Sequence, residues 1–300
     1  MFQTYRYYIL LHLIIFMWGF TGILGKLIEL EAFIIVWHRV LIAFLALGIY
    51  LWFKKKPLRI SNWQSGLKLV GVGIIVALHW ITFYKSIQLS TASLGILCLS
   101  TTTLHVTWLE PLVMKRPFQL TEFLLGFIVI FGIYFVSSDF QPHEYEALVY
   151  GLLSALCAAF FSVFNAKLAQ DIPTPTITLY EMGTGFVFLS LLLLFQGRLT
   201  SDLFIMTTSD FLWLLFLGIL CTSFAFLVTI EIVKVLGTFT VSLSINLEPI
   251  YTILLAIFIL QEHTLLNSRF YTGATLIILV VLANAWIKNR QRRLKLKNLS

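Results

Sequence analysis

The stretch "AFIIVWHRVLIAFLALGIYLWF", residues 32–53, decides the class of fold. At a rise of about 1.5 Å per residue, a helix of this length crosses the ~30 Å hydrocarbon core of a bilayer. Arg39 is the only charged residue in it, and an arginine at that depth is costly unless other protein groups surround it. The stretch therefore predicts a membrane-spanning helix that packs against further helices.

The composition extends this prediction to the whole chain. Hydrophobic residues make up 59% of the 300 residues and charged residues only 12%, against roughly 25% charged in ordinary globular proteins. A soluble core of this size could not hide so much apolar surface from water. We therefore expect an all-α polytopic membrane protein.

Apolar runs long enough to span a bilayer recur along the chain. The first is too long for a signal-peptide core and is followed at once by the second, so we expect it to be retained. The three cysteines lie inside the runs, which predicts neither disulfides nor a metal site. The ten runs are 8–28, 32–53, 66–87, 92–114, 120–138, 147–168, 176–196, 211–232, 238–260 and 268–287.

The basic residues predict the orientation of these spans. If the N-terminus lies inside and the spans alternate, most of the 21 Lys and Arg residues fall in inner segments, and the outer segment 137–147 contains none. This is the positive-inside asymmetry, and it places both termini in the cytoplasm. The basic tail, 288–300, is then an orientation signal near anionic lipid, so we expect no nucleic-acid partner.

The ten spans divide into two halves of five, residues 8–138 and 147–287. Because five is odd, the second half enters the membrane from the opposite side, which gives an inverted-topology repeat. Many secondary transporters have this arrangement, with a substrate site near the midplane between the halves. The alignment of the halves places Arg39 opposite Glu181.

Four motifs resemble the EamA-type transporters of the drug/metabolite transporter superfamily. They are "WGFTGILGKL" (18–27), "WHRVLIAFLAL" (37–47), "FYKSIQLSTASLGILCLS" (83–100) and "LEPIYTILLAIFILQE" (247–262). The resemblance implies a ten-helix carrier in the bacterial inner membrane that exports amino acids and other small metabolites by alternating access. Where the family often has Thr-Pro in the fourth span, this chain has "STTTL" (100–104), so we expect that span to lack a break.

The ninth span is the most informative for a substrate site. Thr240, Ser244, Glu248 and Tyr251 share one helix face, and Asn246 lies on a neighbouring stripe. Pro249 should break the helix by freeing the carbonyl of Ile245. Glu248 is either a substrate or coupling residue or the structural partner of a buried cation. We expect Ser244, Asn246, Glu248 and Tyr251 to bind substrate.

Other spans supply further candidates for the substrate site. Each has a structural alternative, because intramembrane histidines also bond neighbouring helices and stripes of small residues also mark close packing. Arg39, Lys85 and Glu231 are candidate structural or gating charges, and the last two are either a gate pair or two separate solvated charges. The remaining substrate-binding candidates are Trp18, His79, Thr101, Thr102, His105 and Asn165.

A secondary transporter for a small metabolite is the function these features favour, with a membrane-embedded enzyme or a receptor or channel-like protein as alternatives. No Walker motif appears, so ATP does not drive transport within this chain. Paired intramembrane aspartates are also absent from the sequence, since its aspartates fall in predicted loops. We expect no cofactor, and the partners are a small-molecule substrate and the lipid bilayer. The sequence leaves a homodimer, the substrate, the direction of transport and proton coupling open.

Overall fold

Helices form every secondary-structure element in the part of the chain that the structure describes. This computed structural model describes residues 2–55, 58, 60, 62–138, 140–141 and 144–297. The elements are α1 (Phe2–Leu27), α2 (Ala32–Phe53), α3 (Trp63–Leu89), α4 (Ala92–Leu99), α5 (Thr102–Met114), α6 (Leu120–Ser137), α7 (Glu144–Leu168), α8 (Thr174–Phe195), η1 (Ser201–Phe204), α9 (Thr208–Leu215), η2 (Phe216–Phe224), α10 (Ala225–Leu236), α11 (Thr238–Ile245), α12 (Glu248–Ile259), η3 (Glu262–Thr264) and α13 (Ser268–Lys297).

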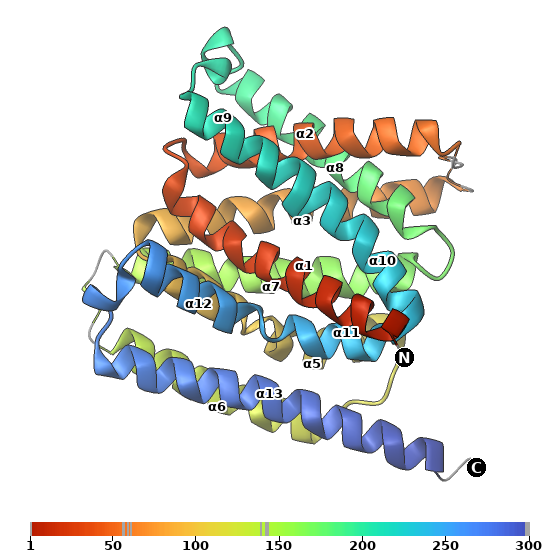
Figure 1. Cartoon of the computed structure of the whole chain (residues 1–300), viewed down its shortest axis with the longest axis vertical. Coiled ribbons are helices and arrows are strands. Elements are labelled where there is room, and N and C mark those ends of the chain that lie inside the picture. Colours follow the sequence, from red (N-terminus) through yellow and green to blue (C-terminus); the bar gives the residue numbers. More distant parts are fainter. Residues whose placement is uncertain are drawn as a thin grey trace.

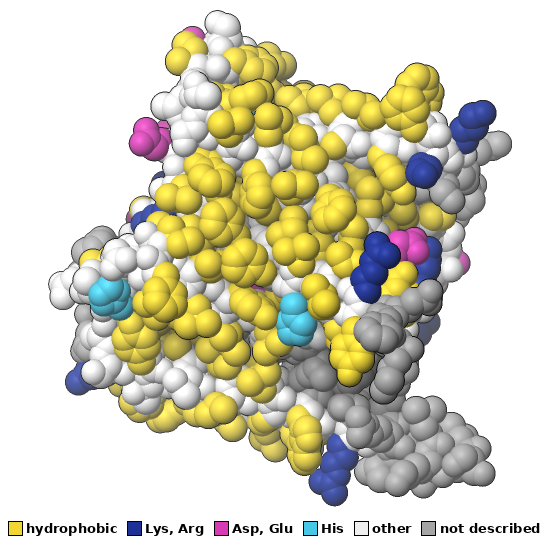
Figure 2. All heavy atoms as spheres, in the orientation of Figure 1, with side chains coloured by type: hydrophobic (Ala, Val, Ile, Leu, Met, Phe, Trp, Pro, Cys, Tyr) yellow, Lys and Arg dark blue, Asp and Glu magenta, His cyan; other side chains and the backbone are white. Residues whose placement is uncertain are grey.

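The helices are those of a multi-pass membrane protein. Within the described residues, seven helical stretches are long and apolar enough to cross a bilayer, and three shorter ones are also apolar. Figure 2 shows a broad hydrophobic surface whose Lys and Arg side chains gather at its edges. The seven long stretches are Tyr5–Leu27, Ala32–Phe53, Trp63–Leu89, Ala92–Met114, Glu144–Leu168, Thr174–Phe195 and Thr208–Leu236, and the shorter ones are Phe123–Ser137, Glu248–Ile259 and Ser268–Asn284.

The fourth predicted span is broken, and the expectation of a continuous helix was wrong. Helix α4 ends at Leu99 and α5 begins at Thr102. Four successive hydroxyls bond backbone carbonyls of the preceding turn, Ser100 to Ile96 at 3.0 Å and the next three residues to carbonyls at 2.6–3.2 Å. Side-chain hydroxyls that bond the carbonyls of the preceding turn compete with the helical ladder and bend the helix. A run of hydroxyls therefore accompanies a break where proline was thought necessary.

The ninth span breaks where its proline predicts. Helix α11 ends at Ile245, and α12 begins at Glu248 with Pro249 in its first turn. Proline has no amide hydrogen, so the carbonyl four residues earlier loses its helical partner. Such a break is tolerated at membrane depth where protein or a cavity surrounds it.

The packing partners of the helices form a consistent pattern. Helix α3 packs on α7 and α8, α2 packs on α8 and η2, and α1 packs on α12 and α10. Helices α6 and α13 lie side by side along one edge, and α1 begins at the same end of the bundle where α13 ends (Figure 1). The backbone of α1 lies close to α12 at a glycine, since a Cβ on Gly22 would lie 2.9 Å from the Thr252 methyl group. The glycines of the first span are thus packing contacts.

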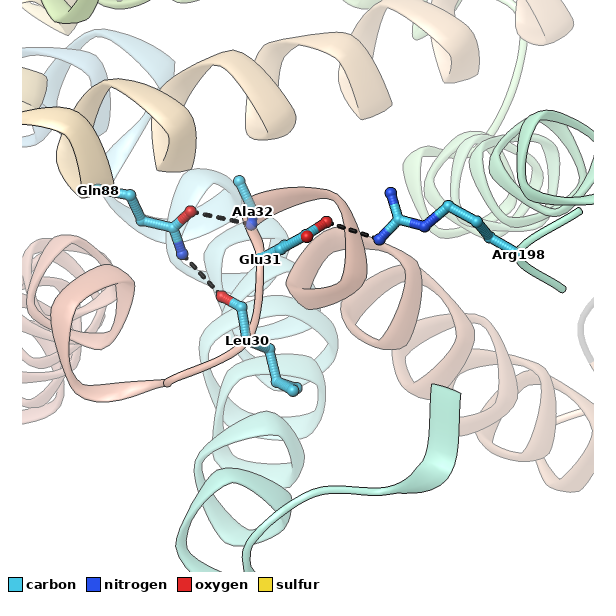
Figure 3. A network of polar contacts seen from close by, with 5 residues as sticks. All are labelled: Leu30, Glu31, Ala32, Gln88 and Arg198. Atoms are coloured by element: carbon cyan, nitrogen blue, oxygen red, sulfur yellow. Dashed lines mark hydrogen bonds and ion pairs between the residues drawn. The ribbon is translucent and has the colours of Figure 1, made fainter. Parts of the chain in front are cut away.

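Polar contacts fasten the connection between α1 and α2. The Gln88 amide, from the end of α3, donates to the Leu30 carbonyl at 2.7 Å and accepts from the Ala32 amide at 3.0 Å. Arg198, which follows α8, pairs with Glu31 at 2.7 Å. Figure 3 shows both interactions converging on this short connection from opposite sides. Helices α3 and α8 therefore both hold the α1–α2 connection.

A buried carboxylate caps the start of α4. The two oxygens of Glu262, in η3, accept hydrogen bonds from the backbone amides of Ala92 at 2.7 Å and Ser93 at 3.0 Å. Glu262 is only 2% exposed. A negative charge at a helix N-terminus interacts favourably with the helix dipole and its free amides. The cap ties the α12–α13 connection to the first half of the chain.

Candidate functional site

A cavity of about 360 Å³ lies among helices from both halves of the chain. Its aromatic lining is Trp18, Trp80, Phe83, Phe161 and Phe226. Its polar lining is Thr21, Arg39, His79, Ser100, Thr102, Thr103, Ser162, Asn165, Glu181, Asn246 and Glu248. Both broken helices contribute to its wall, because residues at each break line it. A concave, largely apolar pocket that also presents polar groups is the usual form of a small-molecule site.

Arg39 points into the bundle from α2. Its Nε donates to the Thr222 hydroxyl at 3.0 Å and its Nη1 to the Tyr84 hydroxyl at 3.1 Å. Its guanidinium carbon lies 3.9 Å from the centre of the Trp80 ring, a cation–π arrangement. Two hydroxyl groups and an indole ring therefore surround the charge, as expected of an arginine at this depth. The guanidinium has further N–H donors, and Arg39 lines the cavity.

A π-helical segment, η2, presents the partners of Arg39 and Trp18. The Thr222 hydroxyl donates to the Leu217 carbonyl, five residues back, at 2.8 Å and accepts from Arg39. The indole of Trp18 donates to the carbonyl of Cys221 at 3.1 Å. Such π-helical turns occur often at functional sites because their wider turns leave carbonyls free. The sequence analysis missed this segment, although Thr222 and Ser223 interrupt an apolar run.

Two carboxyl groups lie in the cavity wall in different surroundings. Glu248, in the first turn of α12, lines the same cavity as Arg39. Glu181, on α8, is 4% exposed, and its buried Oε1 has no hydrogen-bond partner. The alignment of the halves placed Glu181 opposite Arg39 but did not mark it as a site residue. Gly73 explains its position, since a Cβ there would lie 2.9 Å from the Glu181 carbonyl oxygen.

His79 lines the cavity and is also held by structure. Its Nδ1 lies 2.9 Å from the Ser154 hydroxyl and 3.0 Å from the Ser154 carbonyl oxygen, both on α7. Its ring centre lies 5.3 Å from that of Phe161. Helix α7 therefore fixes the ring, so that His79 joins α3 to α7 while it faces the cavity.

A comparison with known families agrees with the cavity and the helical fold. The model of the EamA-like transporter family matches residues 6–138 and again residues 146–286. This chain belongs to the EamA-like transporter family. The family is one of membrane transporters, and the chain carries two copies of its unit.

Solved structures share the fold of this EamA-like transporter. Of 24 matching chains, one described as "Crystal structure of protein" is 15% identical with a TM-score of 0.65. The match covers 95% of this chain and 99% of that one. No curated protein matches the transporter in sequence. The fold of the whole chain is thus that of a known structure, while the likeness says nothing of its substrate.

The cavity brings together about half of the predicted site residues of the transporter. Those in its wall are Trp18, Arg39, His79, Thr102, Asn165, Asn246 and Glu248, and those outside its lining are Lys85, Thr101, His105, Glu231, Ser244 and Tyr251. The Tyr251 hydroxyl lies 3.0 Å from Nδ1 of His12 on α1. The predicted face of the ninth span ran through residues 246–247, where the helix breaks, so Ser244 lies on α11 whereas Glu248 and Tyr251 lie on α12.

Lys85 and Glu231, considered either a gate pair or two separate solvated charges, form no ion pair with each other among the described residues. Glu231 instead pairs with Lys234, one turn further along α10, at 2.7 Å, and both side chains are 63% exposed. Lys85 lies four residues before the end of α3. Among the described residues of the transporter, no group of three His, Cys, Asp or Glu side chains could hold a metal ion.

Proposed function

We propose that this EamA-like transporter is a secondary carrier that exports a small amphipathic metabolite, such as an amino acid or a related compound, by alternating access. The observation that carries the proposal is the cavity shared by both halves, which combines one cation, two carboxyls and several aromatic rings. An aromatic wall binds an apolar body, while the polar groups orient the ends of a ligand. Arg39 would bind an anionic group and Glu248 would balance its charge.

We further propose that ten spans form two inverted five-helix repeats, with both termini in the cytoplasm of a bacterial inner membrane. The packing pattern supports this symmetry. Helices α1, α2 and α3 are the first three spans, α7 and α8 are the sixth and seventh, and η2 and α10 belong to the eighth. When each span is exchanged for the one five places away in the chain, the packed pair α3–α7 becomes the packed pair α10–α1, and α3–α8 becomes η2–α2. The α2–α8 and α6–α13 pairs map onto themselves. Such an exchange is expected when a pseudo-twofold axis relates the halves.

The polar contacts of the connections suggest which side of the carrier is closed. The Gln88, Arg198 and Glu262 contacts all hold connections that the proposed topology places on the outer side. On the cavity side, Asn165 lies three residues before the end of α7, which the same topology places on the inner side. We infer from these contacts a state closed toward the outside, from which an exporter would receive its substrate.

Counterflow in liposomes tests the proposal. Purified protein is reconstituted into liposomes loaded with a mixture of unlabelled amino acids, and uptake of each labelled amino acid is measured. We expect exchange of at least one, with at least a tenfold loss for Arg39→Leu. Conversion of the labelled compound to a product would favour an enzyme, and leak that needs no counter-substrate would favour a channel. Reporter fusions to each terminus test the topology, and opposite sides would refute it.

A further inference from the structure

Two acceptor oxygens in the cavity wall have no hydrogen-bond partner. Oε1 of Glu181, on α8, and Oδ1 of Asn165, on α7, are buried and unpartnered. Both residues line the same cavity. A carboxylate oxygen and the carbonyl oxygen of an amide side chain both accept hydrogen bonds. Buried acceptors without donors are costly, so the pair is prepared for a ligand that donates hydrogen bonds.

The charges of the cavity are not balanced. Its lining holds the cation of Arg39 and two carboxyl side chains, Glu181 and Glu248. Glu181 takes part in no ion pair among the described residues. A buried carboxylate without a counter-charge is costly in a low-dielectric site. A positive charge on the ligand would supply what the protein does not.

We propose that Glu181 and Asn165 form a subsite for the ammonium group of a primary amine with an apolar or aromatic body. An ammonium group has three N–H donors, which suit a carboxylate and an amide oxygen. Phe161, one turn before Asn165 on α7, lines the same cavity and offers an aromatic surface to the body of the ligand. This subsite rests on the proposed function, and it narrows the substrate class to amines.

Three probes of similar size share a phenyl ring on a short chain and differ in their polar group. They are phenethylamine, 2-phenylethanol and 3-phenylpropionate. The melting temperature of the purified protein in detergent is measured against the concentration of each, because a ligand that binds the folded state raises it by mass action. We expect phenethylamine to bind at least tenfold more tightly than the alcohol. Equal binding of the amine and the alcohol would overturn the proposal.

Variants of the cavity residues test which side chains cause the preference for phenethylamine. Glu181→Gln keeps the shape and removes the charge, so the tenfold preference for phenethylamine should disappear, and Asn165→Ala should reduce it severalfold. Glu231→Gln is the matched control, because Glu231 is exposed and outside the cavity lining, and it should retain the full preference. If Glu181→Gln does not fold, Asn165→Ala decides alone. An amine preference that survives in these variants, or that only Glu248→Gln removes, would overturn the subsite.

The binding assay separates this proposal from that of transport. Amine binding that depends on Glu181, in a protein that gives no counterflow, would support the subsite and refute the carrier. Counterflow of metabolites without any preference for amines in the melting assay would support the carrier and refute the subsite. Each proposal therefore fails by its own measurement.

Discussion

Replacing Glu262 by alanine tests the cap that joins the two halves of the chain. The substitution removes the acceptors of the Ala92 and Ser93 amides, which its carboxylate now binds at 2.7 and 3.0 Å. Both residues are fully buried, as is Glu262 at 2% exposed. Water does not reach these amides unless the structure opens around them.

The expected loss of stability follows from the two hydrogen bonds that the substitution removes. A buried donor left without an acceptor costs about 1–3 kcal/mol, so two cost roughly 2–6 kcal/mol. The charge at the N-terminus of α4 adds about 0.3–2 kcal/mol. Removing a buried carboxylate also recovers part of its desolvation cost. We expect a net loss of about 3 kcal/mol in the free energy of unfolding for Glu262→Ala, and less for Glu262→Gln, which keeps one acceptor oxygen.

Reversible unfolding of the purified protein in mixed micelles of a mild detergent and dodecyl sulfate measures this loss. Glu29→Ala is the control, because Glu29 is an exposed glutamate whose backbone amide, rather than its side chain, bonds Asp210. The control should change the free energy by no more than about 0.5 kcal/mol. The reasoning is refuted if Glu262→Ala unfolds within the range of the control.

Three further predictions concern packing and charge. Arg39→Lys should destabilise the protein by about 1–3 kcal/mol in the same unfolding assay. A lysine cannot contact the Trp80 ring as a planar guanidinium does and also donate both hydrogen bonds. Wild-type stability of this variant would contradict the prediction. Gly73→Val should lower the melting temperature and cost about 1–3 kcal/mol or more of the free energy of unfolding, since its Cβ would lie 2.9 Å from a backbone oxygen. Gly71→Val is the control and should be nearly neutral, because nothing lies within 4 Å of a Cβ at that position. Lys234→Ala should cost less than about 1 kcal/mol because its ion pair with Glu231 is exposed, and a larger loss of stability would refute that estimate.

The class of fold could be predicted from the sequence because its signal is summed over many residues. The run at 32–53 coincides with α2, and a single charge inside it is enough to predict a partnered arginine. The membrane dictates this pattern, since residues facing lipid and residues facing other helices are both apolar. Composition and periodicity therefore indicated a polytopic helical protein, while the resemblance of four motifs indicated the transporter family that the family model confirms.

The site was harder to predict because it depends on local departures from the regular helix. A shared face along the ninth span requires one continuous helix, whereas the span is divided into α11 and α12 at residues 246–247. The role of Thr222 depends on the five-residue register of η2. Glu181 looks like an isolated charge in an apolar sequence, and only the approach of α3 at Gly73 and of Asn165 explains its surroundings. Tertiary contacts of this kind leave no periodic trace in one chain.

The two broken helices differ in whether the break can be undone. At residues 100–101 every backbone amide is present, and Ser100 and Thr101 bond carbonyls both through their amides and through their hydroxyls. No backbone donor is therefore missing between α4 and α5. At Pro249 one donor is missing, and no change of side-chain rotamer can restore an absent amide hydrogen. A straight helix thus remains compatible with the backbone donors of the first break, whereas the proline of the second break excludes a complete helical ladder.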